Sequence, residues 1–190
     1  MNKSIITILV FINFISCVSV DLRKSYQRPL QEHTIIKGKS EKKIVIIDII
    51  GNIGTQGSSS LLEQNISVVQ KVVSRLQLAE YDPLVKGVIL RIDSPGGTVV
   101  GSEILFDEIS KFKKRSGKKI VAYVLNVAAS GGYYAAIAAD KIISHPSSIV
   151  GSVGAIYLYP ELTDLSKKVG VTMHVHKSGH LKDMGSVFKK

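Results

Sequence analysis

The stretch Val88-Ile89-Leu90-Arg91-Ile92-Asp93-Ser94-Pro95-Gly96-Gly97 decides the fold of this chain. Its first five residues are apolar apart from Arg91, which is the pattern of a strand buried in a sheet. The Ser-Pro-Gly-Gly sequence that follows is typical of a tight turn, because proline and glycine interrupt strands. We therefore expect a buried strand that ends in a turn at Gly97.

Strand and helix patterns alternate on both sides of this stretch. Apolar β-branched runs predict strands, and the run at residues 44–50 is expected to be buried on both faces. The predicted strands cover residues 44–50, 120–125 and 171–176, and the predicted helices cover residues 61–82, 102–114 and 128–139. Strands joined by helices at this spacing predict a parallel sheet, whose functional groups gather beyond the carboxyl ends of the strands.

Composition limits the class of protein. A chain of 190 residues with 45% hydrophobic and 21% charged residues suits one ordinary domain with a buried core. The formal net charge is +10, but the chain has no tryptophan and only 6% aromatic residues, so it lacks the basic and aromatic interleaving of nucleic-acid binding proteins. Cys17 is the single cysteine, which excludes an intramolecular disulfide framework and a cysteine-based zinc site.

The N-terminus predicts a targeting or anchoring segment. Residues 5–20 are mainly apolar, and charged residues follow directly. A helix of this length reaches about 24 Å, which is less than the roughly 30 Å of a membrane's hydrocarbon core. A cleaved signal peptide and a short retained anchor therefore both stay open, as does a lipoprotein site at Cys17. We expect a signal anchor or signal peptide at residues 1–20, a linker at 21–43 and a folded domain at 44–190.

Ser130 is the candidate nucleophile. It lies in the sequence Ala128-Ala129-Ser130-Gly131-Gly132-Tyr133-Tyr134, between a predicted strand and the next helix. Small neighbours allow a substrate carbonyl to approach closely, and N–H groups at the start of a helix can stabilise negative charge. A serine in such a setting is by itself more often a packing site or a helix cap. The turn Ser94–Gly97 strengthens the catalytic interpretation, because it ends the neighbouring strand and its two glycines let the backbone turn N–H groups towards a neighbouring site, as an oxyanion hole requires.

A serine nucleophile needs a general base. The histidines suit this role poorly, since they fall in the linker, in a turn or away from any carboxylate. His145 and His180 are the bases to consider if no lysine fills the role. A neutral lysine is the alternative, and burial has to lower its pKa from about 10.4 towards about 7–8. Lys182 is the preferred candidate, but the residues alone barely distinguish it from Lys177.

Five ordered segments of the chain resemble the SppA-type signal peptide peptidases. They span roughly residues 44–188 and are Arg91 to Gly97, Ala128 to Tyr134, Ala139-Asp140-Lys141-Ile142, Gly151-Ser152-Val153-Gly154 and Lys177 to Asp183. The resemblance implies a Clp-protease/crotonase-like α/β fold, which is a repeated β-β-α spiral with a mainly parallel sheet. It also implies a serine endopeptidase with a Ser–Lys dyad and with no metal, nucleotide or other cofactor.

The resemblance implies a role for each matching residue. Ser130 is expected to be the nucleophile and Lys182 the general base, with oxyanion N–H groups from Gly97 and Gly131. Ser152 is expected to hydrogen-bond the lysine amine and orient it. Such an enzyme is expected to sit in a bacterial inner membrane through its N-terminal segment, with its catalytic domain facing the periplasm or the outside. It is expected to form homo-oligomers and to degrade signal-peptide remnants or other hydrophobic peptides.

The chain departs from the family pattern at its C-terminal end. It stops at Lys190, where family members usually continue with further helices, and Val187 stands where proline is usual. We therefore expect a protease domain that lacks its C-terminal part. The alternatives are a catalytically inactive assembly subunit with the same fold and, more remotely, a crotonase-type enzyme that acts on acyl thioesters.

Two charge patterns give further expectations. Basic residues crowd positions 111–119, which suits a helix C-terminus that complements the helix dipole, with contact to anionic lipid headgroups as the alternative. Acidic residues are scarce near the proposed site, where Asp93, Asp140 and Asp183 are the candidates. We therefore expect a preference for small or apolar substrate side chains.

Overall fold

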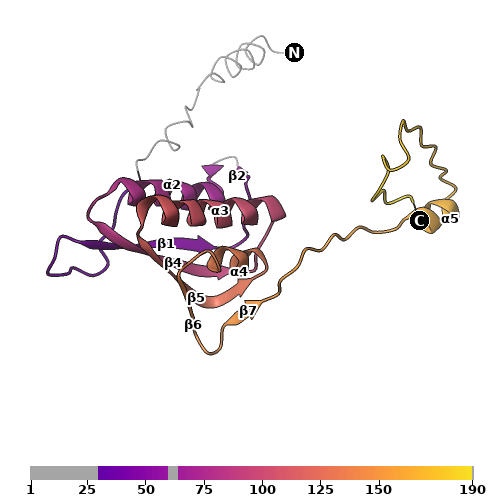
Figure 1. The fold of residues 1–190 in the computed structure, drawn as a ribbon. Coiled ribbons are helices and arrows are strands. Elements are labelled where there is room, and N and C mark those ends of the chain that lie inside the picture. The colour runs from indigo at the N-terminus through magenta and orange to yellow at the C-terminus, as the bar shows by residue number, and fades with distance from the viewer. Residues whose placement is uncertain (1–29, 60–63, 190) are drawn as a thin grey trace, which may run out of the picture. The chain divides into compact units, whose positions relative to one another are not determined.

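The computed structural model describes residues 30–59 and 64–189, and the targeting or anchoring segment expected at residues 1–20 lies outside these ranges. The chain divides into two compact units, Met1–Val153 and Gly154–Lys190 (Figure 1). In the described ranges, no helix combines the length and the apolar character needed to cross a bilayer.

The first unit is built on a five-stranded sheet in which every pairing is parallel. Its strands are β1 (Lys43–Ile50), β4 (Val85–Ser94), β5 (Lys119–Ala129), β6 (Lys141–Ser144) and β7 (Ile149–Gly151). Their order is β1-β4-β5-β6, and β7 continues the edge by pairing with the last residues of β5. A small antiparallel pair, β2 (Ser58–Ser59) and β3 (Gln64–Asn65), lies outside this sheet. The mainly parallel α/β fold expected from the sequence is confirmed.

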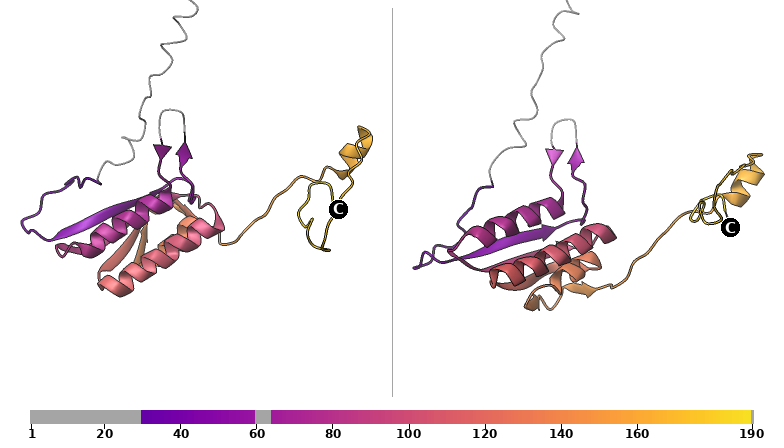
Figure 2. Two further views of the ribbon diagram at one scale, coloured as in Figure 1. Left: turned by 90° about the horizontal axis from the view of Figure 1, so that it is seen from above. Right: turned by 45° about the horizontal axis from the view of Figure 1, so that its top comes forward.

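Helices connect the strands of the main sheet. They are α2 (Val68–Tyr81), α3 (Val99–Ser116) and the short α4 (Gly131–Ala136), and the second unit contributes α5 (Thr163–Lys168). Figures 1 and 2 show α2 and α3 side by side on the same face of the sheet. This placement is what successive right-handed crossovers between neighbouring parallel strands produce.

Local sequence explains where these helices begin and end. Ser67 caps α2 through a capping box, in which its hydroxyl accepts from the Gln70 N–H and the Gln70 side chain accepts from the Ser67 N–H. Thr98 caps α3 in a similar way, so this helix begins three residues earlier than we predicted. The helix ends at Gly117, whose φ of +66° is readily adopted by glycine.

The core lies between the sheet and the helices that cover it. Ile47, Leu90 and Phe112 have no exposed surface. The expectation that residues 44–50 are buried on both faces is wrong, because only alternate side chains point towards the helices. Ile47 and Ile49 are therefore buried, while Ile44 is 60% exposed.

Two further predictions from the sequence need correction. The strand predicted at 120–125 runs on to Ala129, because Val127–Ala129 pair with β7 and extend the ladder. Residues 128–129 therefore belong to a strand and not to a helix. The segment 171–176 forms no strand, since its residues are exposed and, within the described part of the chain, have no neighbouring strand to pair with.

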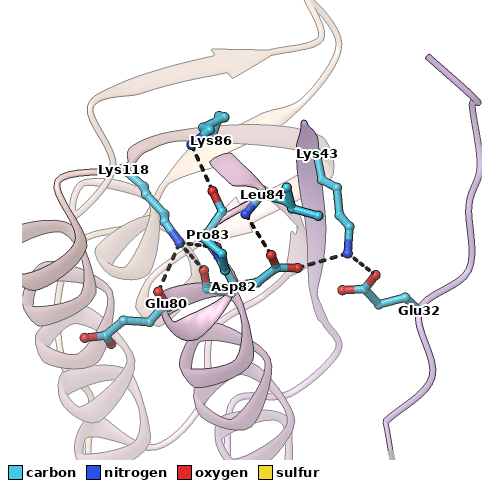
Figure 3. A network of polar contacts seen from close by, with 9 residues as sticks. Glu32, Lys43, Glu80, Asp82, Pro83, Leu84, Lys86 and Lys118 are labelled. Carbon is cyan, nitrogen blue, oxygen red and sulfur yellow. Dashed lines mark hydrogen bonds and ion pairs between the residues drawn. The ribbon is translucent and has the colours of Figure 1, made fainter. Parts of the chain in front are cut away.

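A network of charges closes the C-terminal end of α2 (Figure 3). The Lys118 ammonium donates to the main-chain carbonyls of Ala79, Glu80 and Asp82, which the helix leaves without internal partners. The Asp82 carboxylate in turn accepts from Lys43, and this contact holds the pKa of Asp82 below its usual value. Lys118, one of the basic residues at 111–119, thus has a structural role at a helix end.

Candidate active site

Ser130 lies at the junction between β5 and α4. Its φ of +49° and ψ of −118° form a backbone conformation that residues with a side chain rarely adopt. The Ser130 N–H donates to the Gly151 carbonyl of β7 at 2.8 Å, and the Ser130 carbonyl accepts from the Tyr134 N–H at 2.9 Å. Hydrogen bonds on both sides therefore hold this strained conformation.

Two glycines after Ser130 allow neighbouring backbone to come close. A Cβ atom on Gly132 would lie 2.7 Å from the Ser94 carbonyl oxygen, and a Cβ on Gly131 would collide with the Ser102 hydroxyl. The first turn of α4 consequently packs directly against the end of β4 and the start of α3. No larger residue fits at either position without movement of its neighbours.

The turn after β4 packs against the same junction. Gly96 has a φ of +99°, and a Cβ there would lie 2.9 Å from the Ser130 Cβ and 2.7 Å from the Gly131 nitrogen. The turn is also joined to Ile53, whose N–H donates to the Gly96 carbonyl at 2.8 Å. The structure therefore brings together the backbone segments that carry Ser130, Gly131 and Gly97.

Unused N–H groups are a second feature of this junction. Within the described ranges, neither the Gly97 N–H nor the Gly131 N–H donates a hydrogen bond to another residue. Paired N–H groups beside a serine hydroxyl are the arrangement that stabilises a developing oxyanion. The junction can therefore support nucleophilic chemistry at a carbonyl group.

Tyr134 anchors α4 to α3. Its ring stacks on Phe106 with centroids 4.6 Å apart and planes 8° apart. Its hydroxyl donates to the Glu103 carboxylate at 2.9 Å, and this hydrogen bond raises the pKa of Tyr134. Because Tyr134 is one turn after Ser130, these contacts fix the helix that begins at the candidate nucleophile.

The backbone of Ser152 lies beside the same site. It follows Gly151, whose carbonyl accepts the Ser130 N–H, and it too has a positive φ of 54°. Four of the five predicted site residues, namely Gly97, Ser130, Gly131 and Ser152, thus belong to the first unit.

Lys182 belongs to the second unit. It is exposed, its N–H donates to the Gly179 carbonyl at 3.2 Å, and its ammonium contacts no hydrogen-bonding partner among the residues that the structure describes. Lys177, by contrast, forms an ion pair with Asp183 at 2.7 Å, and Lys189 contacts the same carboxylate at 3.1 Å. The hydrogen bonds from Lys177 and Lys189 lower the pKa of Asp183 to about 2.

The acidic residues expected near the site have other partners. Asp93 accepts from the Asn126 side chain at 2.7 Å and from the Val127 N–H. The expectation that Asp140 lies near Ser130 is wrong, because its carboxylate accepts from the Ile120 N–H at the opposite end of β5. Across residues 30–59 and 64–189, no group of three His, Cys, Asp or Glu side chains is placed to hold a metal ion.

Two serines at this site were not assigned a role from the sequence. Ser94 and Ser102 are 0% and 5% exposed, and each uses its hydroxyl to bond nearby backbone. The position of Ser94 within a Ser-Pro-Gly-Gly turn is a usable signal, because serine hydroxyls often bond the backbone two residues on. Ser102 gives no comparable signal, since its contact with Gly131 arises only in the folded chain.

Residues 112–190 match the model of peptidase family S49. A candidate signal peptide peptidase SppA of Enterococcus faecium is 38% identical over 157 residues, which are 83% of this chain and 45% of that protein. A candidate protease of Methanocaldococcus jannaschii is 30% identical over 185 residues, covering 97% of this chain and 58% of that protein. The chain thus spans about half the length of these relatives.

A solved structure shares the fold. A membrane-bound stomatin-specific protease superposes with a TM-score of 0.52 at 20% sequence identity, over 64% of this chain and 53% of that one. This likeness agrees with the parallel sheet and its crossover helices. Sequence and fold together identify this chain as a relative of the SppA-type peptidases of family S49.

Proposed function

We propose that this chain carries the nucleophile and the general base of a serine endopeptidase. In this reaction the Ser130 Oγ attacks a peptide carbonyl carbon, and its proton passes to the neutral Lys182 amine. The carbon–nitrogen bond of the peptide then breaks, and the departing amine takes the proton back from Lys182. The Lys182 amine then takes a proton from water, which attacks the acyl carbon. The ester bond to Ser130 breaks, and Lys182 returns the proton to the Ser130 Oγ.

The remaining site residues support this reaction. The Gly97 and Gly131 N–H groups stabilise the oxyanion that forms as Ser130 attacks. The Ser152 hydroxyl orients the lysine amine. The observation that carries the proposal is the backbone of Ser130, which is held at φ +49° beside two glycine N–H groups that other described residues do not use. Strain of this kind gathers at functional sites, because the surrounding structure must maintain it.

Lys182 is the better base of the two lysines in its segment. The ammonium of Lys177 is held by the Asp183 carboxylate at 2.7 Å and is therefore already engaged in an ion pair. Lys182 has no such contact within the described residues.

The setting of the enzyme is part of the proposal. The apolar residues 5–20 tether the chain to a membrane, with the catalytic unit on the extracytoplasmic side, and several copies assemble. The substrates are hydrophobic peptides such as signal-peptide remnants. This choice is supported by the scarcity of free acidic side chains around Ser130, since Asp93 is occupied by Asn126 and Val127.

A non-catalytic assembly subunit is the second candidate. Exposure of Lys182 favours it, because a Ser–Lys dyad needs a lysine that is removed from water. This candidate predicts oligomers that retain the fold and do not turn over peptides.

The test is hydrolysis of a fluorogenic peptide rich in leucine and alanine by the 190-residue chain. We expect turnover by the wild type and a loss of several orders of magnitude in Ser130→Ala and in Lys182→Met. Lys177→Met is the matched control, because it removes the same group five residues away, and it should keep most of the activity.

Each other outcome has a defined meaning. Loss of activity in Lys177→Met with retention in Lys182→Met would assign the base to Lys177. Full activity in both lysine variants would exclude the dyad and direct attention to His145 or His180. A folded wild-type chain without turnover would favour the assembly subunit.

A further inference from the structure

We infer that Ser94 is a positioning residue for the oxyanion donor of this site. The inference rests on the proposed function, because it concerns the same reaction at Ser130. Ser94 is the last residue of β4 and has no exposed surface. Its hydroxyl donates to the Gly51 carbonyl at 2.6 Å and accepts from the Gly96 N–H at 3.1 Å.

The hydrogen bonds of the turn show what the Ser94 hydroxyl does. The proline of the turn has no N–H group. The Gly96 N–H is used by Ser94, and the Thr98 N–H donates to the Ile53 carbonyl at 2.8 Å. Within the described residues, the Gly97 N–H is therefore the one main-chain donor of the turn that is left without a partner.

Ser94 also joins three segments that meet at the nucleophile. Its hydroxyl reaches Gly51, which directly follows β1, and it binds its own turn through Gly96. Its carbonyl oxygen lies so close to Gly132 that a Cβ atom there would be only 2.7 Å away. Ser94 consequently fixes the turn relative to Gly132, which lies in the first turn of α4 and two residues after Ser130.

Removal of this hydroxyl should turn the donor away from the oxyanion. The Gly96 N–H and the Gly51 carbonyl would both lose the Ser94 hydroxyl as a partner. Because Gly96 is buried, water cannot readily replace that partner. A buried N–H group without a partner is costly, so we expect the turn to shift until this N–H finds another acceptor. Rotation of the peptide groups of Gly96 and Gly97 would misplace an interaction that matters mainly in the transition state, so turnover should fall more than substrate binding.

The experiment compares Ser94→Ala with wild type and with a matched control, Ser116→Ala. The Ser116 hydroxyl donates to the Phe112 carbonyl and accepts from the N–H two residues on, which is the same pattern at the far end of α3. We expect kcat of Ser94→Ala to fall about tenfold to a hundredfold with KM within about twofold, and affinity for a peptide aldehyde inhibitor to fall in parallel. Ser116→Ala should keep both values.

Other results would overturn the inference. Wild-type kcat and aldehyde affinity in Ser94→Ala would do so while leaving the proposed function intact, whereas absence of turnover in wild type would remove the proposed function itself. If Ser94→Ala does not fold, Ser94→Cys decides, because the thiol fills the space but bonds weakly. A lower kcat of Ser94→Cys, with KM unchanged, supports the positioning role. Wild-type kcat in Ser94→Cys, or loss of fold in both variants, would reduce Ser94 to a stability element.

Discussion

The two regions that carry the proposed dyad are built in different ways. The junction around Ser130 is fixed by main-chain contacts, since β7, the turn after β4 and α3 all approach it closely. The segment around Lys182 consists of turns, and its defined contacts are hydrogen bonds between residues close in the sequence and the ion pairs of Asp183. The proposed nucleophile therefore has its geometry built into the fold of the first unit, whereas the proposed base lies on an exposed segment of the second unit.

This difference predicts how the two regions respond to change. Packing and backbone fit should control the first region, so alterations of volume there are expected to be costly. Charge and pH should control the second region, where side chains are solvated and substitutions are expected to be mild.

The largest contrast should appear between two truncations of apolar side chains. Phe112→Ala removes a side chain with no exposed surface from the core between α3 and the sheet. It should lower the free energy of unfolding by about 3–5 kcal/mol. Leu181→Ala, at a position that is 68% exposed, should change it by less than about 0.5 kcal/mol. Urea unfolding followed by circular dichroism measures both, and similar losses would show that the two regions are packed alike.

A smaller contrast is expected between two glycines. Gly132→Ala places a methyl group against the Ser94 carbonyl oxygen and should destabilise the chain by about 1–3 kcal/mol, with a matching loss of turnover at Ser130. Gly179→Ala meets nothing within 4 Å and should be neutral or slightly stabilising. Thermal unfolding of the two variants separates these outcomes, and a neutral Gly132→Ala would break the claim that backbone fit fixes the nucleophile.

The sequence predicts β4 and the turn after it well. The run at 88–92 was predicted as a buried strand, and the turn beginning at Ser94 follows it as expected, because local apolar patterning and glycine signals decide both. The sequence did not predict β7 or the continuation of β5 to Ala129, because these short segments become strands only by pairing with each other. The strand predicted at 171–176 failed for the same reason, as no partner strand is available to it within the described residues.

The site shows the same division. Ser130 could be selected from its small neighbours and its place after a strand, and its position at the β5–α4 junction is confirmed. Its positive φ and the contact of Gly131 with Ser102 depend on long-range packing, which sequence spacing does not encode. The pairing of Lys177 with Asp183 could be foreseen no better, since several lysines lie within reach of that carboxylate.

The smallest expected effect concerns the charge of the second region. Two lysines hold the pKa of Asp183 at about 2, below its ordinary value of 3.8. A carboxylate with a lowered folded-state pKa stabilises the fold above pH 3.8, and this contribution is lost as the pH falls through about 2. Lys177→Met should move the pKa of Asp183 upward towards 3.8, which a carboxyl-carbon NMR titration measures. An unchanged titration curve would mean that the ion pair does not persist in solution.

Covalent labelling tests the central claim, that the β5–α4 junction presents an activated serine, most directly. The full chain would be incubated with a fluorophosphonate probe, digested and mapped by mass spectrometry, with Ser130→Ala and Ser152→Ala as companions. The account predicts a single adduct on Ser130 in the wild type, a weaker adduct on Ser130 in Ser152→Ala because the lysine is less well oriented, and none in Ser130→Ala. An adduct on another serine, or a folded wild-type chain that stays unlabelled, would contradict it.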